Sequence, residues 1–317
     1  MARAGQAVDP SPLGQPLEFH FARRSAPNRF LKAAMSERMC SWTEDNSFAR
    51  GIPSTIQHCQ PKPISVSDVP LDTKNMGNTF AVPRAATEDE IKNIITGFAH
   101  AAEFLDRAGY DGIELHAAHG YLLSQFLSQA TNLRRDKYGG SPTNRMRLIL
   151  EIRAAITEKF EPNGIVRDEA WELCRAREEH EFDFVELSGG KYKNLDEDDT
   201  AKHVISKKHE AFFLDVAQKV VSSLTKMKSY LTGGFRSTAG MVDGIGLARP
   251  FCQEPFLCHD ILSGKIPGAT IPVMDQLNYQ LAVAAACIQM RQIGNNVQPM
   301  DLSSQDAVDA VTAAVKG

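Results

Sequence analysis

The chain has 317 residues, 43% of them hydrophobic and 23% charged, which is an ordinary composition for a soluble globular protein. Its formal net charge of −4 gives no electrostatic support for binding to nucleic acid or to an anionic membrane surface. The longest apolar runs, such as residues 281–288, are too short to cross a bilayer, and residues 1–14 lack the apolar core of a secretory signal. We therefore expect a cytoplasmic protein without a nucleic-acid or membrane partner.

The first half of the chain alternates candidate strands and helices, beginning with a strand at residues 28–35. A helix is expected from Thr87, where the sequence Thr-Glu-Asp-Glu has the spacing of a capping box, to a stop at Gly109. Apolar and polar residues then alternate over 111–116, which is the period of a strand. Ser141-Pro142 opens a further helix, since proline is tolerated in the first turn. Its apolar face is expected to comprise Met146, Ile149, Leu150, Ile152 and Ile156.

The second half continues this pattern, which predicts an α/β fold with a parallel sheet. A helical tail begins after residue 270, and its main helix is expected at 275–293. We expect a first domain over residues 1–270 and the tail over 271–317. Further strands are expected at 164–166, 182–187, 229–233 and 244–247, and helices at 168–181 and 209–224.

The six cysteines show neither a CxxC motif nor close pairing with histidine. Cys252 and Cys258 flank Pro255 at a spacing that is weak as a metal motif. Reduced thiols in a cytosolic protein account for this pattern, and we expect no metal site.

The end of the predicted strand at 111–116 concentrates titratable side chains. His116, His119 and Tyr121 lie within six residues and precede a polar loop that contains glycine. In an α/β barrel, the loops that follow the carboxyl ends of the strands carry the chemistry. Two imidazoles can donate hydrogen bonds to one carbonyl oxygen, and a nearby phenol can give up a proton. The pattern therefore indicates polarisation and protonation of a carbonyl-bearing substrate.

The same stretch begins a longer set of motifs. It reads HAAHGYLLSQFLS and then NLRRDKYGGSPTNR; the other pieces are PLGQPLEFHF, APNRFLKAAMSER, FDFVELSGG, LTGGFRSTAGMV and DGIGLARPF. Together they cover most of residues 11–295 and resemble, in order, the Old Yellow Enzyme family of FMN-dependent NAD(P)H:flavin oxidoreductases. The resemblance implies a (β/α)8 TIM barrel with FMN at its C-terminal mouth and NADPH or NADH as the reductant.

The resemblance also implies roles for individual residues. His116 and His119 would bind the carbonyl or phenolate oxygen of a small-molecule substrate, and Tyr121 would protonate its α-carbon while hydride from the flavin reaches the β-carbon of an activated C=C. The similarity to fungal-type members points to specialised metabolites as substrates. Around the flavin ring it places Ala34, Met35 and Ser36, and at the phosphate it places Gly233, Gly234, Ala248 and Arg249. The loop that shapes the site would comprise Asn132, Arg134, Asp136, Tyr138, Gly139 and Gly140.

The expected barrel is incomplete, because about six strands can be recognised where closure needs eight. Segment 43–55 runs almost directly into 56–68, and shorter gaps follow residues 166 and 242. A glutamine on the family's third strand and a basic residue on its fifth strand, both flavin contacts, have no counterpart. Two hypotheses remain open. The first is an ene-reductase-type flavoenzyme. The second is a degenerate barrel with weak or no catalysis, which is either a non-enzymatic remnant or the product of an incorrect gene model. An aldolase-like barrel lacks a candidate Schiff-base lysine at a strand end.

Overall fold

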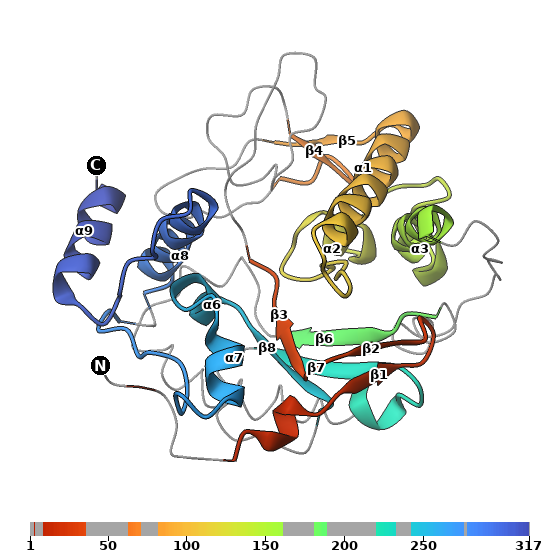
Figure 1. Ribbon diagram of the computed structural model, residues 1–317. Coiled ribbons are helices and arrows are strands. Elements are labelled where there is room, and N and C mark those ends of the chain that lie inside the picture. The colour runs from red at the N-terminus through yellow and green to blue at the C-terminus, as the bar shows by residue number, and fades with distance from the viewer. Residues whose placement is uncertain are drawn as a thin grey trace. The chain divides into compact units, whose positions relative to one another are not determined.

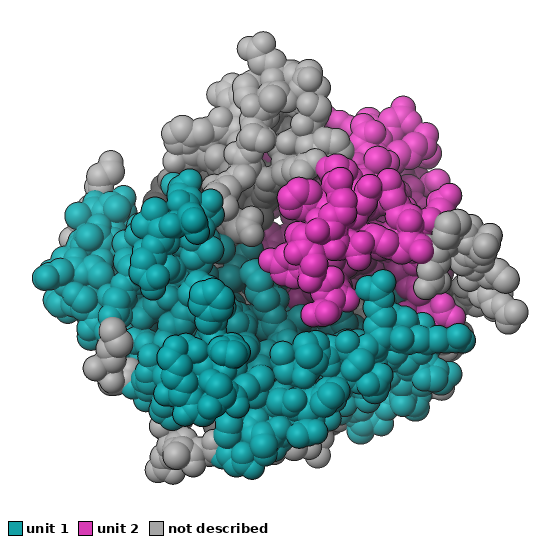
Figure 2. Space-filling model, in the orientation of Figure 1, with its two compact units in different colours: residues 1–37, 182–189, 197–317 teal, residues 38–181, 190–196 magenta. Residues whose placement is uncertain are grey.

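A computed structural model describes residues 3, 9–35, 63–70, 82–160, 181–188, 220–232, 242–275 and 278–316 (Figure 1). The strand expected at 164–166 and the helix expected at 168–181 fall almost wholly outside these residues, as does most of the helix expected at 209–224. The chain divides into two compact units (Figure 2). Unit 1 comprises residues 1–37, 182–189 and 197–317, and unit 2 comprises residues 38–181 and 190–196.

Unit 1 contains a four-stranded parallel sheet with the strand order β3-β8-β7-β6. Three predicted strands are confirmed almost to the residue, and the one expected at 28–35 is shorter. Because every strand runs in the same direction, all four carboxyl ends lie at one edge of the sheet (Figure 1). The strands are β3 (Phe30–Lys32), β6 (Phe184–Ser188), β7 (Lys228–Thr232) and β8 (Gly244–Leu247).

Two glycines of β8 allow it to pack closely against β7. A Cβ atom on Gly246 would lie 1.7 Å from the Oγ1 atom of Thr232, and one on Gly244 would lie 2.3 Å from the Cε1 atom of Tyr230. Neither glycine has an unusual backbone conformation, so the requirement for glycine here is one of space. The two glycines of the DGIG sequence therefore leave room for the side chains of Tyr230 and Thr232 on the neighbouring strand.

An antiparallel pair of strands precedes the sheet and was not expected from the sequence. Strands β1 (Leu17–Phe19) and β2 (Arg24–Ala26) are joined by a turn in which Arg23 has a φ of 50°. The carboxylate of Asp183 accepts hydrogen bonds from the backbone N–H groups of Phe21 and Ala22, at 3.2 and 2.8 Å. This carboxylate fixes the turn to the residues that lead into β6.

Helices complete unit 1, and the main helix expected at 275–293 is observed over Tyr279–Gly294. An apolar cluster formed by Met274, Ala282, Ala285, Leu302, Val308 and Val311 joins its last two helices. The buried side chain of Gln289 donates a hydrogen bond to the carbonyl oxygen of Met300 at 2.9 Å, so this polar group is satisfied inside the apolar cluster. The helical elements are η1 (Ser11–Gly14), α6 (Arg249–Gln253), α7 (Leu257–Leu262), α8 (Tyr279–Gly294) and α9 (Gln305–Lys316).

Unit 2 is built around α1 (Glu88–Arg107) and α3 (Pro142–Phe160), which pack side by side (Figure 1). The predicted capping box is confirmed: Thr87 accepts from the backbone N–H of Glu90, whose carboxylate accepts from the N–H of Thr87. Helix α1 ends before Gly109, which has a φ of 83°. On α3, three of the expected face residues are buried; Leu150 and Ile156 are only half-buried, and Leu148 is buried instead.

The strand predicted at 111–116 is wrong, because residues 112–118 form neither helix nor strand. A strand exists only through hydrogen bonds to a neighbour, and none of the strands in the described ranges pairs with this segment. Unit 2 instead has a two-stranded parallel sheet of β4 (Ile64–Ser65) and β5 (Arg84–Ala85). The described residues thus contain an α/β fold with parallel strands and no closed barrel. No described helix combines the length and apolarity needed to cross a membrane.

Candidate active site

The first part of the candidate site is a tight turn in unit 2, between the segment at 112–118 and helix α2 (Leu122–Leu127). Its two central residues both have left-handed backbone conformations, with φ of 59° at His119 and 84° at Gly120. Glycine adopts this conformation without penalty, whereas a histidine there is strained. The N–H of Tyr121 donates to the carbonyl oxygen of Ala118 at 3.3 Å and closes the turn.

This turn brings together the three residues expected from the sequence to carry catalysis. The Nδ1 atom of His119 lies 3.2 Å from the Nε2 atom of His116, and their rings stack with centroids 5.2 Å apart. The Tyr121 ring centroid lies 5.7 Å from that of His116. The chain thus gathers two imidazoles and a phenol within a few ångströms of one another.

A carboxylate that sequence reasoning passed over completes the cluster. The Oε1 atom of Glu114 lies 3.3 Å from the Nδ1 atom of His116, and both side chains are mostly buried. A carboxylate in this position orients an imidazole and determines which ring nitrogen carries the proton. The second oxygen of Glu114 is buried and has no hydrogen-bond partner within the described part of the chain. In the sequence, Glu114 lies two residues before His116, and this spacing could have indicated that the carboxylate contacts the imidazole.

The loop after α2 is held by side chains that hydrogen-bond to the backbone. Buried Asn132 donates from Nδ2 to the carbonyl oxygens of Phe126 and Tyr138, at 2.7 and 2.8 Å. Arg134 donates to the carbonyl oxygen of Ala86 at 2.7 Å and forms an ion pair with Asp136, which lowers the pKa of that carboxyl group. These contacts show a scaffolding role for the loop.

Two further residues hold this loop: Arg145 on α3, which was not anticipated, and Tyr138, which was expected among the loop residues. The buried guanidinium of Arg145 donates to the carbonyl oxygens of Leu127 and Gly140, and so ties the start of α3 to the end of α2. The Tyr138 hydroxyl donates to Glu151 at 2.7 Å, and burial together with this carboxylate raises the pKa of the phenol. Gly139 is required by space, because a Cβ atom would lie 2.0 Å from the carbonyl oxygen of Arg134.

The second part of the candidate site is the carboxyl edge of the sheet in unit 1. Ala34 and Met35 follow β3, and Ala248 and Arg249 follow β8, which pairs with β3 in register. The N–H of Ala33 continues the pairing by donating to the carbonyl oxygen of Leu247 at 2.8 Å. The structure thus gathers these four predicted cofactor residues at one edge. Ser36, Gly233 and Gly234 lie outside the described residues.

The groups at this edge fit a phosphate-bearing cofactor such as FMN. The hydroxyl of Thr232, at the end of β7, is buried and has no hydrogen-bond partner among the residues the structure describes. A phosphate oxygen could accept from such a hydroxyl, and the exposed guanidinium of Arg249 could bind the same anion. Cys252 contacts Met35, with their sulfur atoms 3.5 Å apart, and burial raises the pKa of its thiol to about 11. Cys252 is therefore a neutral packing residue.

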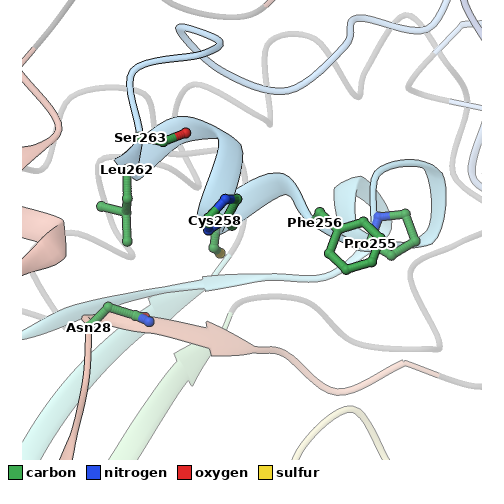
Figure 3. A pocket seen from close by; sticks show the side chains of 7 residues that line it. Asn28, Pro255, Phe256, Cys258, Leu262 and Ser263 are labelled. Atoms are coloured by element: carbon green, nitrogen blue, oxygen red, sulfur yellow. The ribbon is translucent and has the colours of Figure 1, made fainter.

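A separate pocket in unit 1 has a different position and character (Figure 3). Asn28, which precedes β3, lines one side of this pocket, and the other lining residues belong to α7 and the residues around it. Burial raises the pKa of its Cys258 thiol to about 12, which leaves the thiol un-ionised and unreactive. The other residues that line it are Pro255, Phe256, His259, Leu262 and Ser263.

Comparison with solved structures defines the class of fold. The chain is similar to morphinone reductase, with a TM-score of 0.53 and 19% identity, over 84% of this chain and 92% of that one. It is also similar to the Old Yellow Enzyme homologue from Zymomonas mobilis, with a TM-score of 0.54 and 18% identity, over 84% and 96% of the two chains. The fold is therefore that of the α/β barrels of Old Yellow Enzyme type, present here in incomplete form.

The sequence comparisons define the family. The profile of the NADH:flavin oxidoreductase / NADH oxidase family matches residues 50–265. The chain is 68% identical to the NADH-dependent flavin oxidoreductase nadA of Aspergillus parasiticus, over 100% of this chain and 93% of the relative. It is 36% identical to the NADH-dependent flavin oxidoreductase iccE of Talaromyces variabilis, over 62% and 56%. The chain belongs to this family and is an FMN-dependent oxidoreductase that uses a nicotinamide reductant.

The alignment with nadA also bears on the gaps inferred from the sequence. It extends over 414 residues, whereas the chain has only 317, so nearly a hundred positions of the relative have no counterpart. Both ends of the chain are aligned, so these missing positions are internal. The chain therefore differs from this relative by internal deletion within an otherwise closely similar sequence.

Proposed function

We propose that the protein reduces the activated C=C bond of a small α,β-unsaturated carbonyl compound, in the cytoplasm and with NADH as the reductant. The observation that carries this proposal is the cluster of His116, His119 and Tyr121 on one turn. Bound FMN would supply the hydride. The choice of NADH rests on the names of the relatives nadA and iccE, which are both NADH-dependent flavin oxidoreductases. A specialised metabolite as the substrate rests on the resemblance to fungal-type members of the family.

The imidazoles supply hydrogen-bond donors for the substrate oxygen. As hydride reaches the β-carbon, negative charge develops on that oxygen, and a positioned N–H group stabilises it. In the structure His116 and His119 contact each other through Nε2 and Nδ1. A substrate oxygen that accepts from the pair would replace this contact, while Glu114 keeps hold of Nδ1 of His116. Glu114 would thus prevent the His116 ring from turning away when the substrate binds.

The phenol of Tyr121 supplies the proton. A tyrosine with an ordinary phenol is protonated at neutral pH and can act as a general acid. Its ring lies beside that of His116, which supports a role in protonating the carbon adjacent to the bound carbonyl. The groups that would hold FMN are Ala34, Met35, Thr232, Ala248 and Arg249, together with Ser36, Gly233 and Gly234 by family resemblance.

The proposal is tested by separating the two halves of the reaction in His116→Ala. With FMN bound, anaerobic reduction by NADH should be nearly unchanged, whereas reoxidation by cyclohex-2-enone should slow by the loss of one oxyanion donor, about 2.7–4 kcal/mol or roughly a hundred- to a thousandfold. His100→Ala, on helix α1, is the matched control and should leave both steps unchanged. Reoxidation of His116→Ala at the wild-type rate would contradict the proposal.

A further inference from the structure

The side chain of Gln125 spans the space between the catalytic turn and strand β4. Its Nε2 atom donates to the carbonyl oxygen of Gly120 at 2.9 Å, and its Oε1 atom accepts from the hydroxyl of Ser65 at 2.6 Å. The orientation of this amide is determined by its partners, because the reverse orientation would place two oxygen atoms against each other at Gly120. The three residues thus form a continuous chain, Ser65 to Gln125 to Gly120.

Both ends of this chain are fixed by other contacts. Ser65 lies in the β4–β5 sheet and is mostly buried, and its carbonyl oxygen accepts from the N–H of Ala86 at 2.8 Å. The backbone of Gln125 is held at both polar groups: its N–H donates to Tyr121, and its carbonyl oxygen accepts from the Thr131 hydroxyl, at 2.9 and 2.8 Å. A side chain anchored in this way can restrain the peptide to which it is bonded.

That peptide is the one whose conformation needs restraint. It joins Gly120 to Tyr121 and follows the strained left-handed residue His119. If the turn relaxed, both the His119 ring and the Tyr121 ring would move relative to His116, since they are attached on either side of Gly120. A strained conformation persists only where its surroundings determine it, and Gln125 supplies a direct bond to the turn.

We propose that Gln125, oriented by Ser65, is a positioning residue for catalysis. It holds the His119–Gly120–Tyr121 turn in the conformation that presents the second imidazole and the phenol to the same substrate. The effect of Gln125 on catalysis rests on the proposed function. The hydrogen bond by which Gln125 restrains the turn is present in the folded chain whatever the function. Gln125 would contact neither substrate nor cofactor. It would affect catalysis only through its hydrogen bond to the carbonyl oxygen of Gly120.

The test uses three substitutions in the full-length FMN-loaded protein. Gln125→Glu keeps the acceptor for Ser65 but places an oxygen against the Gly120 carbonyl, Ser65→Ala removes only the orienting hydroxyl, and Ser65→Thr restores a hydroxyl. Gln129→Glu, an exposed position in the following loop, is the matched control for the change in charge. The readouts are the ¹⁵N and ¹H signals of the His116 and His119 rings, the affinity for 4-nitrophenol, and the two half-reactions.

Gln125→Glu should shift the ring signals of His119, weaken 4-nitrophenol binding by about tenfold, and slow reoxidation by cyclohex-2-enone while reduction by NADH is retained. Ser65→Ala should show the same changes at about threefold, and Ser65→Thr should reverse them. Ring signals and affinity matching those of Gln129→Glu would overturn the inference. Equal slowing of both half-reactions would overturn it too, since that is the mark of a general structural defect.

Failure of the proposed function would look different. In that case wild-type protein and His116→Ala would bind 4-nitrophenol equally or not at all, and neither would be reoxidised by the enone. The ring signals of His119 in Gln125→Glu would still show whether the amide restrains the turn. Unshifted signals in that variant would overturn the positioning role whatever the substrate.

Discussion

The two candidate regions, one in each unit, are built in different ways. In unit 1 the predicted cofactor residues lie at one edge because a ladder of parallel strands sets their register, with Lys32 opposite Leu247 and Thr232 opposite Gly246. In unit 2 the segment before the catalytic turn belongs to no ladder, and side chains such as Gln125 and Asn132 hold the neighbouring backbone. In this part of unit 2, side-chain hydrogen bonds hold the backbone of the turn and of the following loop.

The largest effect should come from the turn itself. Tyr121→Phe removes the proposed proton donor but leaves the ring in place, so turnover with an unactivated enone should fall by about a hundredfold to ten-thousandfold. Reduction by NADH should persist, and strongly activated substrates that can take a proton from water should be spared. Stopped-flow measurement of each half-reaction decides this. Equal loss in both half-reactions would mean that Tyr121 only supports the structure of the turn.

A pair of glycine substitutions compares the packing of the two regions. Gly246→Ala should lower the free energy of unfolding by about 1–3 kcal/mol, because its Cβ atom would lie 1.7 Å from the Oγ1 atom of Thr232. Gly112→Ala, in the unpaired segment of unit 2, meets nothing within 4 Å and should be nearly neutral. Denaturant unfolding measures both.

A second substitution controls for the cause of the Gly246→Ala effect. Adding Thr232→Ala should recover part of the lost stability, because it removes the hydroxyl that the new methyl group would strike. If Gly112→Ala were as destabilising as Gly246→Ala, the segment at 112–118 would be as tightly packed as the sheet, and the contrast between the two regions would fail.

A smaller effect is expected at the start of α1. Hydrogen bonds from Arg84 lower the pKa of Glu90 to about 2, from 4.5. A depressed pKa means that the carboxylate stabilises the fold above pH 4.5 and that this stability is lost as the pH falls toward about 2. The pair is partly exposed, so we expect only about 1 kcal/mol. Glu90→Gln should flatten the pH dependence of unfolding in that window. The matched control Glu88→Gln, on the same turn, should not.

The sequence predicted what local rules determine. The capping box at Thr87 defined the start of α1, and glycine and proline marked the boundaries around Gly109 and Pro142. The strand at 111–116 was wrong, because alternation predicts a strand only where a neighbour is present to pair with it. The β1–β2 pair was missed because three-residue strands around the left-handed Arg23 leave no periodic signal.

For the candidate site, the sequence singled out His116, His119 and Tyr121 because they are close along the chain, and in the structure their rings lie near one another. It could not give the role of Gln125, since that role depends on Ser65, sixty residues earlier. A contact between residues that are far apart in the sequence can be identified only once the fold is known. Nothing in the sequence around Ser65 or Gln125 indicated that the two side chains are hydrogen-bonded.

Titration of the apo-protein with FMN measures whether this internally shortened chain keeps a flavin-binding site. Saturable binding of one FMN per chain is expected, with an affinity at least about tenfold weaker than that of nadA, because two flavin contacts of the family have no counterpart here. Arg249→Ala should weaken binding further. An apo-protein that binds no FMN even at millimolar concentration, or whose binding is unaffected by Arg249→Ala, would contradict the account.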